Sequence, residues 1–238
     1  GNDRYLGSRY AQGSAAAKLF DSSRTVIARA LPPGDLDALK QGEALLERAI
    51  TVAPNDAWLL HYLGYALYRE ATLRMGKDGE DTRPLMERAD SILERSIIVS
   101  AIPESYALRS GLLGMMIGTN PLRGMTLGPK SGEQMEKALS LGPNNPRVWL
   151  LRGIGAVHTP SMFGGGLDRA EEYLKKSIAL FESDRPASPA PSWGKSEAHV
   201  WLGQVYAKQE KTEAARAEYQ KALALEPNDM WTRMSLLP

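Results

Sequence analysis

Apolar side chains recur every three to four residues along most of the chain, in paired segments separated by short polar or glycine- and proline-containing turns. The pattern is clearest near the C-terminus, where it predicts one helix over Ser196–Ala207 and a second over Thr212–Leu225. Pro227 follows the second segment and cannot continue it. Gly203 lies inside the first segment, where glycine costs about 1 kcal/mol relative to alanine. We therefore predict that the partner helix approaches closely at Gly203.

Similar but noisier helix pairs precede this unit. Three of them carry extra residues between their two helices, in stretches that contain glycine or proline and that we predict to be loops on one edge of the molecule. These inserted loops lie at 75–84, 118–130 and 159–166. A proline- and serine-rich stretch at 183–194 is predicted to be a loop or linker. Residues 230–238 are predicted to begin a capping helix with Trp231 and Leu236 facing inward.

The C-terminal unit resembles the tetratricopeptide repeat, a helix–turn–helix motif of about 34 residues. His199 stands where the signature has its first tryptophan, and the other signature positions are filled by Leu202, Gly203, Tyr206, Ala215, Tyr219, Ala222 and Pro227. The resemblance implies an all-α, right-handed solenoid forming a single domain over residues 1–238, with about five repeats and a C-terminal capping segment. The expected repeats are 8–56, 57–103, 104–145, 146–184 and 196–229.

A second, local resemblance concerns Pro160–Gly166, a PxxFGGG turn, together with the upstream stretch Asn145–Val148. Similar segments are found in bacterial tetratricopeptide proteins. The resemblance implies a bacterial protein that is periplasmic or envelope-associated after removal of a signal segment, with a cytoplasmic location as the alternative. The start at Gly1 agrees with either a removed signal segment or a truncated chain.

The composition mainly excludes certain classes of partner and of binding site. The net charge of +1 gives no general attraction to nucleic acid or to anionic membranes, and no apolar run approaches the roughly 20 residues needed to span a bilayer. The chain has no cysteine, which excludes disulfides and thiolate metal sites. No catalytic motif surrounds the three histidines. We expect no enzyme activity, no cofactor and no bound metal, although the methionines near the loops, with His158, leave a Cu(I) site as a minor alternative.

By the resemblance, the first helix of each repeat lines a concave groove. The second repeat places four aromatic residues on that face, and aromatic and arginine side chains supply most of the binding energy in protein interfaces. The predicted groove residues are Trp58, His61, Tyr62, Tyr65, Tyr68, Arg69, Arg109, Arg147, His158 and Trp201. The alternative is that this face is covered by the N-terminal helix or by inserted loops folded back into the groove.

The leading functional hypothesis is a non-enzymatic scaffold or adaptor that binds a peptide or protein segment in the groove. It predicts that Tyr62, Tyr65 and Arg109 are accessible and face one cavity. The alternative is a small-ligand binding protein, for a solute or metal, whose pocket is closed by the inserted loops and bordered by Arg123, His158 and Phe163. A structural assembly unit is a third possibility, and the oligomeric state is left open.

The glycine-rich turn could also present backbone N–H groups to an anion at a helix N-terminus. The predicted loop site consists of Arg123, Phe163, Gly164, Gly165 and Gly166. The competing interpretation, which we favour, is a conformationally demanding turn with Phe163 buried as a plug, because three consecutive glycines supply unusual backbone freedom.

Overall fold

Helices pair along the whole described part of the chain. The computed structural model describes residues 15–75, 77 and 79–237, so residues 8–14 of the first predicted repeat lie outside the described residues. Within the described residues there is no strand. The helices are α2 (Ala15–Ala30), α3 (Leu36–Val52), α4 (Ala57–Arg74), α5 (Arg83–Val99), α6 (Pro103–Thr119), α7 (Gly124–Leu141), α8 (Pro146–His158), α9 (Leu167–Phe181), α10 (Lys195–Lys208) and α11 (Thr212–Leu225).

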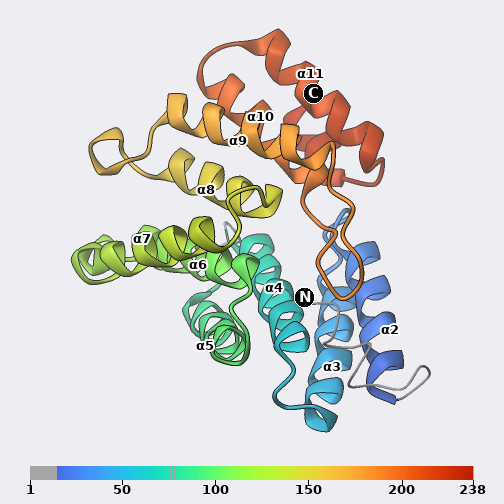
Figure 1. Cartoon of the computed structure of the whole chain (residues 1–238). Coiled ribbons are helices and arrows are strands. Elements are labelled where there is room, and N and C mark those ends of the chain that lie inside the picture. Colours follow the sequence, from blue (N-terminus) through green and yellow to red (C-terminus); the bar gives the residue numbers. More distant parts are fainter. Residues whose placement is uncertain (1–14, 76, 78, 238) are drawn as a thin grey trace.

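Successive helices form hairpins, from α2–α3 to α10–α11, and the hairpins stack into a curved solenoid (Figure 1). The first helices of neighbouring hairpins also contact one another, α4 with α6, α6 with α8, and α8 with α10. The all-α helical-hairpin architecture predicted from the sequence is therefore confirmed. Short helical turns lie at η2 (Pro121–Arg123), η3 (Ser161–Phe163) and η4 (Thr232–Leu236).

Small residues set the spacing within the hairpins. A Cβ atom on Gly203 would lie 2.4 Å from the ring of Tyr219 on α11, and one on Gly64 would lie 2.4 Å from Leu93 on α5. Both distances are far below van der Waals contact, so the helices can approach this closely only because glycine lacks a side chain. The predicted close approach at Gly203 is confirmed and recurs in the second repeat.

The inserted stretch at 118–130 differs from the prediction. Most of it is helical, because η2 is followed directly by α7, which contains Pro129 in its second turn. Proline removes one backbone hydrogen bond from a helix interior. Leu127 is buried in the hydrophobic core, however, and α7 packs along α6. Tertiary packing therefore outweighs the local preference for a loop.

The apolar interior is divided into two large clusters and a small one that consists of Ala57, Trp58 and Ile102. One large cluster extends from α2 to α8, and the other is formed by α8, α9 and α10. Among the described residues, two side chains pack against both large clusters, Ile154 on α8 and Trp193 in the segment between α9 and α10. We call this segment, residues 182–194, the strap. It runs beside the N-terminal helices in Figure 1, and Arg24 on α2 donates a hydrogen bond to Ser188 Oγ at 3.1 Å.

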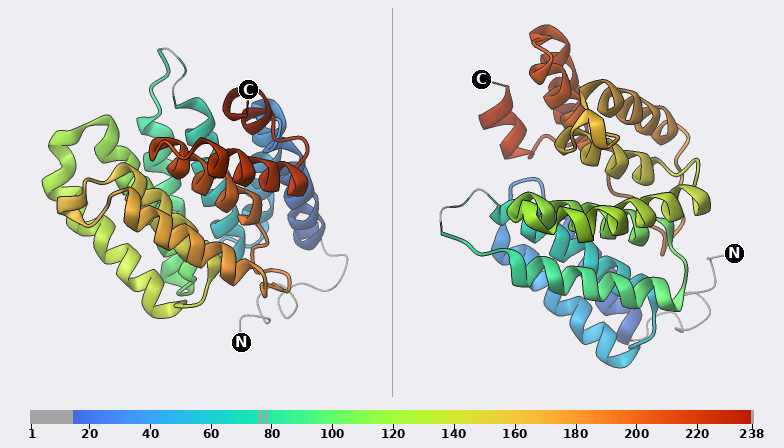
Figure 2. Two further views of the ribbon diagram at one scale, coloured as in Figure 1. Left: turned by 90° about the horizontal axis from the view of Figure 1, so that it is seen from above. Right: turned by 90° about the vertical axis from the view of Figure 1, so that its left-hand side faces the viewer.

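The two ends of the described chain meet. The backbone N–H of Met230 donates to the carbonyl oxygen of Pro32 in the α2–α3 turn at 3.1 Å, and Figure 2 shows the C-terminal segment beside this turn. The capping segment forms a short helical turn, but the predicted inward position of Trp231 is wrong, since 59% of its surface is exposed. This contact between the C-terminal segment and the α2–α3 turn borders the concave side of the solenoid.

Candidate functional site

The concave side holds a cavity of about 780 Å³, which we call the concave cavity. Its walls come from α2 and the α2–α3 turn, α4, α8, the end of the strap, α10 and the C-terminal segment. Most of the lining is apolar or aromatic. The principal aromatic and aliphatic side chains are those of Tyr62, Tyr65, Tyr68, Leu150, Leu151, Ile154, Trp193 and Trp201.

The aromatic residues of α4 are positioned mainly by the strap and by α2. The ring of Trp193 stacks on Tyr65 with centroids 4.4 Å apart and an angle of 9° between the planes. Phe20 of α2 meets the Tyr62 ring edge-on at 5.4 Å. Tyr62 and Tyr65 are only 5% and 2% exposed, so the prediction that both are freely accessible is wrong. The N-terminal helix covers part of this face, as the competing interpretation proposed, and the strap, which that interpretation did not name, covers another part.

Arg147 on α8 holds the strap through an ion pair and an aromatic contact. It is 2% exposed, donates from Nη2 to Asp184 Oδ2 at 2.7 Å, and lies 5.7 Å from the Trp193 ring centroid. An arginine that is paired with a carboxylate and packed over an aromatic ring is a strong, directional anchor. Arg147 is therefore a structural support for the cavity floor and does not line the cavity itself.

The predicted groove residues separate into three groups. Tyr62, Tyr65, Tyr68, Arg69 and Trp201 line the concave cavity. Three more, Trp58, His61 and Arg147, are buried and do not line it, and the ring centroids of Trp58 and His61 are 5.6 Å apart. The remaining two, Arg109 and His158, lie elsewhere.

Arg109 donates to Asp90 Oδ1 on α5 at 2.8 Å, which ties α6 to α5 and away from the cavity. It does not line the cavity, so the prediction that it shares one with Tyr62 and Tyr65 is wrong. His158 is exposed, with its ring 5.6 Å from that of Trp201 and Nδ1 3.1 Å from the carbonyl oxygen of Ile154. Any binding role of the predicted groove residues stays a prediction.

The charged residues that line the cavity are three cations and three carboxylates. The cations are Arg24, Arg69 and Lys195, and the carboxylates are Glu197, Glu226 and Asp229. Arg69 is already engaged, because its Nη1 donates to Tyr65 Oη at 3.0 Å and to Glu197 Oε1 at 3.1 Å. Burial, reinforced by Glu197 and Asp229, raises the pKa of Glu226.

Buried titratable groups beneath the cavity are held in neutral forms. Burial lowers the pKa of His61 to about 3, with a further contribution from Arg147, so its imidazole is neutral at neutral pH. Its Nδ1 lies 2.9 Å from Ser105 Oγ. Burial also raises the pKa of Tyr62 to about 12. Neither group is poised to exchange protons near neutral pH, so the pKa values of these two residues indicate no acid–base role.

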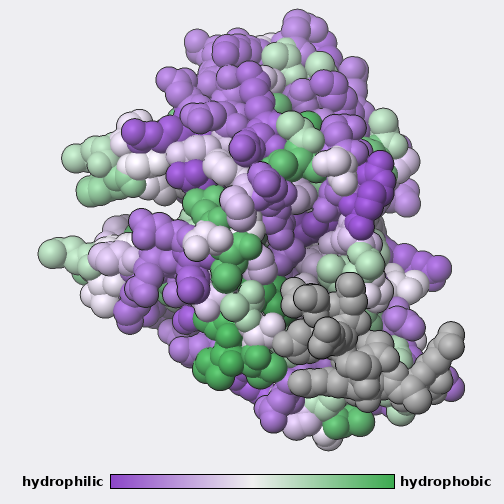
Figure 3. All heavy atoms as spheres, viewed as in Figure 1, coloured by the Kyte–Doolittle hydropathy of each residue, from purple (hydrophilic) through white to green (hydrophobic). Residues whose placement is uncertain are grey.

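Two of the inserted stretches, 118–130 and 159–166, lie on a different edge of the molecule from the concave cavity, whereas Met75, at the start of the third, lines it. Figure 3 shows pale green, apolar tips projecting from the left edge, where Figure 1 places the α6–α7 and α8–α9 connections. Phe163 is 72% exposed, so its predicted burial as a plug is wrong. Neither Phe163 nor Arg123 lines the concave cavity, and Arg123 lies 3.9 Å from Glu87. The predicted pocket bordered by Arg123, His158 and Phe163 does not form in the described structure.

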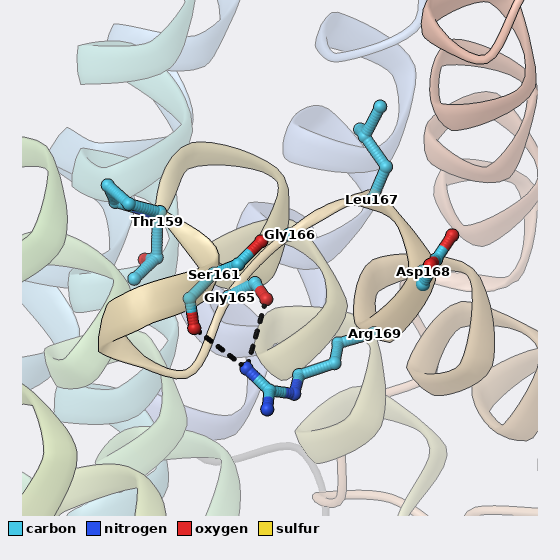
Figure 4. Close-up of a pocket in the computed structure, with 8 residues that line it drawn as sticks. Thr159, Ser161, Gly165, Gly166, Leu167, Asp168 and Arg169 are labelled. Carbon is cyan, nitrogen blue, oxygen red and sulfur yellow. Dashed lines mark hydrogen bonds between the residues drawn. The ribbon is translucent and has the colours of Figure 1, made fainter.

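The glycine-rich turn forms a shallow, open hollow (Figure 4). Gly165 and Gly166 donate their backbone N–H groups to the carbonyl oxygens of Pro160 and Ala156, at 3.1 and 2.9 Å. Arg169 Nη1 donates to the carbonyl oxygens of Ser161 and Gly165. A Cβ on Gly165 would lie 2.0 Å from the Thr159 oxygen, and Gly166 has a φ of +105°. The glycines therefore serve a tight turn, and the N–H groups of Gly165 and Gly166 are already used within it.

Sequence reasoning missed Trp193 and Arg24 as cavity residues. A lone tryptophan at the end of a proline- and serine-rich linker is the one signal that pointed to Trp193, because a large aromatic side chain is seldom left in solvent. No sequence pattern distinguished Arg24, which is half-buried, from the exposed cations Lys18 and Arg29 of α2. Among the described residues there is also no group of three or more His, Cys, Asp or Glu side chains that could hold a metal ion.

Comparison with known proteins supports the repeat fold. The tetratricopeptide repeat family model matches residues 196–229. No curated protein sequence matches the chain. Among solved structures, the chain is similar to the HusA haemophore of Porphyromonas gingivalis, with 28% identity and a TM-score of 0.65 over 84% of this chain and 96% of that one.

It is also similar to a tetratricopeptide protein of Thermus thermophilus, with 21% identity and a TM-score of 0.60 over 92% and 95% of the two chains. At this identity the second likeness shows the fold alone. The protein is thus an all-α solenoid of the tetratricopeptide type. None of its described helices is both long and apolar enough to cross a membrane.

Proposed function

We propose that this protein is a non-enzymatic binding protein that takes a compact, largely apolar ligand into the concave cavity. The cavity itself carries the proposal. Its volume of about 780 Å³ lies in the range of roughly 300–1,000 Å³ that is typical of small-molecule sites, and such sites are mostly apolar with a few polar groups. Contact between the chain ends and the stacked strap gives the cavity a preformed shape, which lowers the entropy cost of binding.

The similarity to a haemophore supports a small-molecule ligand and makes haemin the first compound to test. Haemin would be bound as cargo. A planar apolar molecule could lie against Tyr68, Trp201 and the aliphatic residues of α8, all of which line the cavity. Aromatic contacts of this kind contribute about 0.5–1.5 kcal/mol beyond the burial of apolar area.

The test uses two ligands: haemin, followed by its visible absorbance, and the uncharged methyl ester of 1-pyrenebutyrate, followed by pyrene fluorescence. Ala28→Trp and Gln204→Trp would fill the cavity from α2 and α10, since both residues line it. Ser22→Trp is the matched control on an exposed position of α2 outside the cavity. We expect saturable binding that the two filling variants weaken at least tenfold and the control leaves unchanged. Absence of saturable binding by both ligands would contradict the proposal.

A second candidate is a peptide or protein segment bound on the same concave side. One observation favours it: the strap already lies there as a non-helical chain segment, with Trp193 stacked on Tyr65 and Asp184 paired with Arg147. Peptides selected from a display library against the wild type would support it if they lose binding to Gln204→Trp and keep binding to Ser22→Trp. Peptides that bind both variants equally would place any protein contact outside the cavity.

A further inference from the structure

Buried hydrogen-bonding atoms without partners gather beneath and beside the concave cavity. Tyr62 Oη, Trp193 Nε1, Trp58 Nε1, His61 Nε2 and Arg147 Nε are all buried and unpaired in the described structure. The rings are neighbours, with His61 5.6 Å from Trp58, 5.4 Å from Tyr62 and 6.3 Å from Trp193. Buried polar atoms without partners are rare in folded proteins and cost stability. The cost in stability of leaving several such atoms unpaired in one place therefore has to be explained.

Two of these atoms belong to residues that line the cavity, Tyr62 and Trp193. The hydroxyl and the indole N–H can each donate a hydrogen bond. Arg24 lines the same region, with its guanidinium carbon 5.1 Å from the Tyr62 ring centroid. Among the described residues its one hydrogen bond, from Nη1 to Ser188 Oγ, leaves most of the five guanidinium N–H groups for another acceptor. Arg24 thus places a positive charge at this end of the cavity, and the buried, unpaired donors of Tyr62 and Trp193 lie within its wall.

The carboxylates that line the cavity belong to a different wall. Glu197 lies on α10 and is paired with Arg69, while Glu226 and Asp229 lie in the C-terminal segment. Glu104, whose charge also acts on Tyr62, accepts a hydrogen bond from Asn145 Nδ2 at 2.7 Å. The donors around Tyr62 therefore have no protein carboxylate bonded to them, and a ligand could supply one.

We infer that this end of the cavity binds the carboxylate of an otherwise apolar ligand, through the Tyr62 hydroxyl, the Trp193 indole N–H and the Arg24 guanidinium. An ionised carboxylate has only acceptor sites, and arginine matches its geometry. The apolar body of the ligand would lie along Tyr68, Leu150 and Ile154. The inference rests on the proposed function and specifies the ligand class for the same cavity.

The experiment compares 1-pyrenebutyrate with its methyl ester at pH 7.5, where the acid is ionised. The two probes share the apolar body and differ in the carboxylate. We expect the acid to bind the wild type at least tenfold more tightly, because charge-assisted hydrogen bonds are about twice as strong as neutral ones. Tyr62→Phe and Arg24→Gln should each reduce this preference at least threefold. Arg29→Gln removes the same charge from an exposed position of α2 and should leave it unchanged.

Tyr62→Phe keeps the ring and its packing, so it remains informative if Arg24→Gln fails to fold. Equal affinity for acid and ester would overturn the carboxylate assignment and leave the proposed function standing. An acid preference that persists in both Tyr62→Phe and Arg24→Gln would also overturn it, because the carboxylate would then bind elsewhere. No binding of either probe would contradict the proposed function, and the inference would fall with it.

Discussion

Helices α4 and α10 hold the same place in their hairpins, yet their surroundings differ. Fourteen of the 18 residues of α4 are buried, whereas six of the 14 residues of α10 are. Both helices carry aromatic side chains toward the concave side. On α4, Tyr65 is covered by Trp193 of the strap, while Trp201 of α10 remains partly exposed at the cavity wall.

The difference shows that the repeat pattern determines which face of a helix points to the concave side, but not whether that face is free. Segments between and beyond the repeats decide the second question. Here α2 and the strap cover much of the α4 surface and leave a cavity bordered by α8 and α10. Substitutions can test either the difference in burial between α4 and α10 or the close helix packing that both share.

The largest expected effect comes from Trp193→Ala. Removing the ring takes away its stack on Tyr65 and its contacts with both large apolar clusters. We expect a loss of about 2–4 kcal/mol in the free energy of unfolding, as for other large-to-small changes at packed aromatic residues. Chemical denaturation measures it. Trp231→Ala is the control, since that side chain is 59% exposed. If Trp193→Ala loses no more stability than Trp231→Ala, the strap does not support the fold.

The next effect tests what α4 and α10 have in common. Gly64→Ala and Gly203→Ala each place a methyl group 2.4 Å from a side chain of the partner helix. We expect both to lose about 1–3 kcal/mol, the usual cost of overpacking. Gly155→Ala on α8 meets no atom within 4 Å and should instead gain up to about 1 kcal/mol from helix propensity. Stabilisation in all three variants would contradict the close approach of the helices.

Close packing of α4 against α3 also buries Glu43, and this burial makes the stability of the fold depend on pH. Burial, together with Glu70, raises the pKa of Glu43 to about 8 from an ordinary value of 4.5. The folded state then keeps a proton that the unfolded state releases, so this contribution is complete below pH 4.5 and is lost as the pH rises through 8.

Glu43→Gln removes this titration. We expect the variant to be more stable than the wild type at pH 8.5, by about 1–3 kcal/mol as for other buried groups left without a partner, and to show little difference at pH 4.5. Thermal unfolding at the two pH values measures the change. Asp37→Asn, at an exposed position of the same helix, is the control. A pH-independent difference between wild type and Glu43→Gln would refute the assignment.

The smallest effects separate two tyrosines of α4. Tyr65→Phe removes a hydroxyl that accepts a hydrogen bond from Arg69 and should lose about 1 kcal/mol. Tyr62→Phe removes an unpaired hydroxyl and should be neutral or slightly stabilising. Denaturation midpoints at pH 7.5 without ligand provide the comparison. If Tyr62→Phe is the more destabilising of the two, its hydroxyl is not unpaired in solution.

Much of the architecture could be predicted from the sequence because helical periodicity and close-packing glycines are local signals. The α11 bounds, Thr212–Leu225, and the close approach at Gly203 agree with the structure. The helical start of α7 was missed because glycine and proline favour a loop locally, whereas the buried Leu127 favours packing on α6.

The exposure of the site residues was less predictable from the sequence than the architecture. Repeat register brought Tyr62, Tyr65, Tyr68, Arg69 and Trp201 to one cavity as predicted, but their exposure depends on contacts far apart in sequence. The proline- and serine-rich composition of the strap identifies a loop and says nothing about which side chain it buries. Trp193 could reach Tyr65 only because the curvature of the solenoid brings residues 128 positions apart together (193 − 65).

The most direct measurement of the central claim is hydrogen–deuterium exchange of the whole chain with and without haemin. Binding in the concave cavity predicts slower exchange in α4, the strap and α10, and unchanged exchange at 118–130 and 159–166, the edge that lies away from the cavity. Protection confined to that edge, or saturable haemin binding without protection of α4, the strap or α10, would contradict the assignment of the concave cavity as the ligand site.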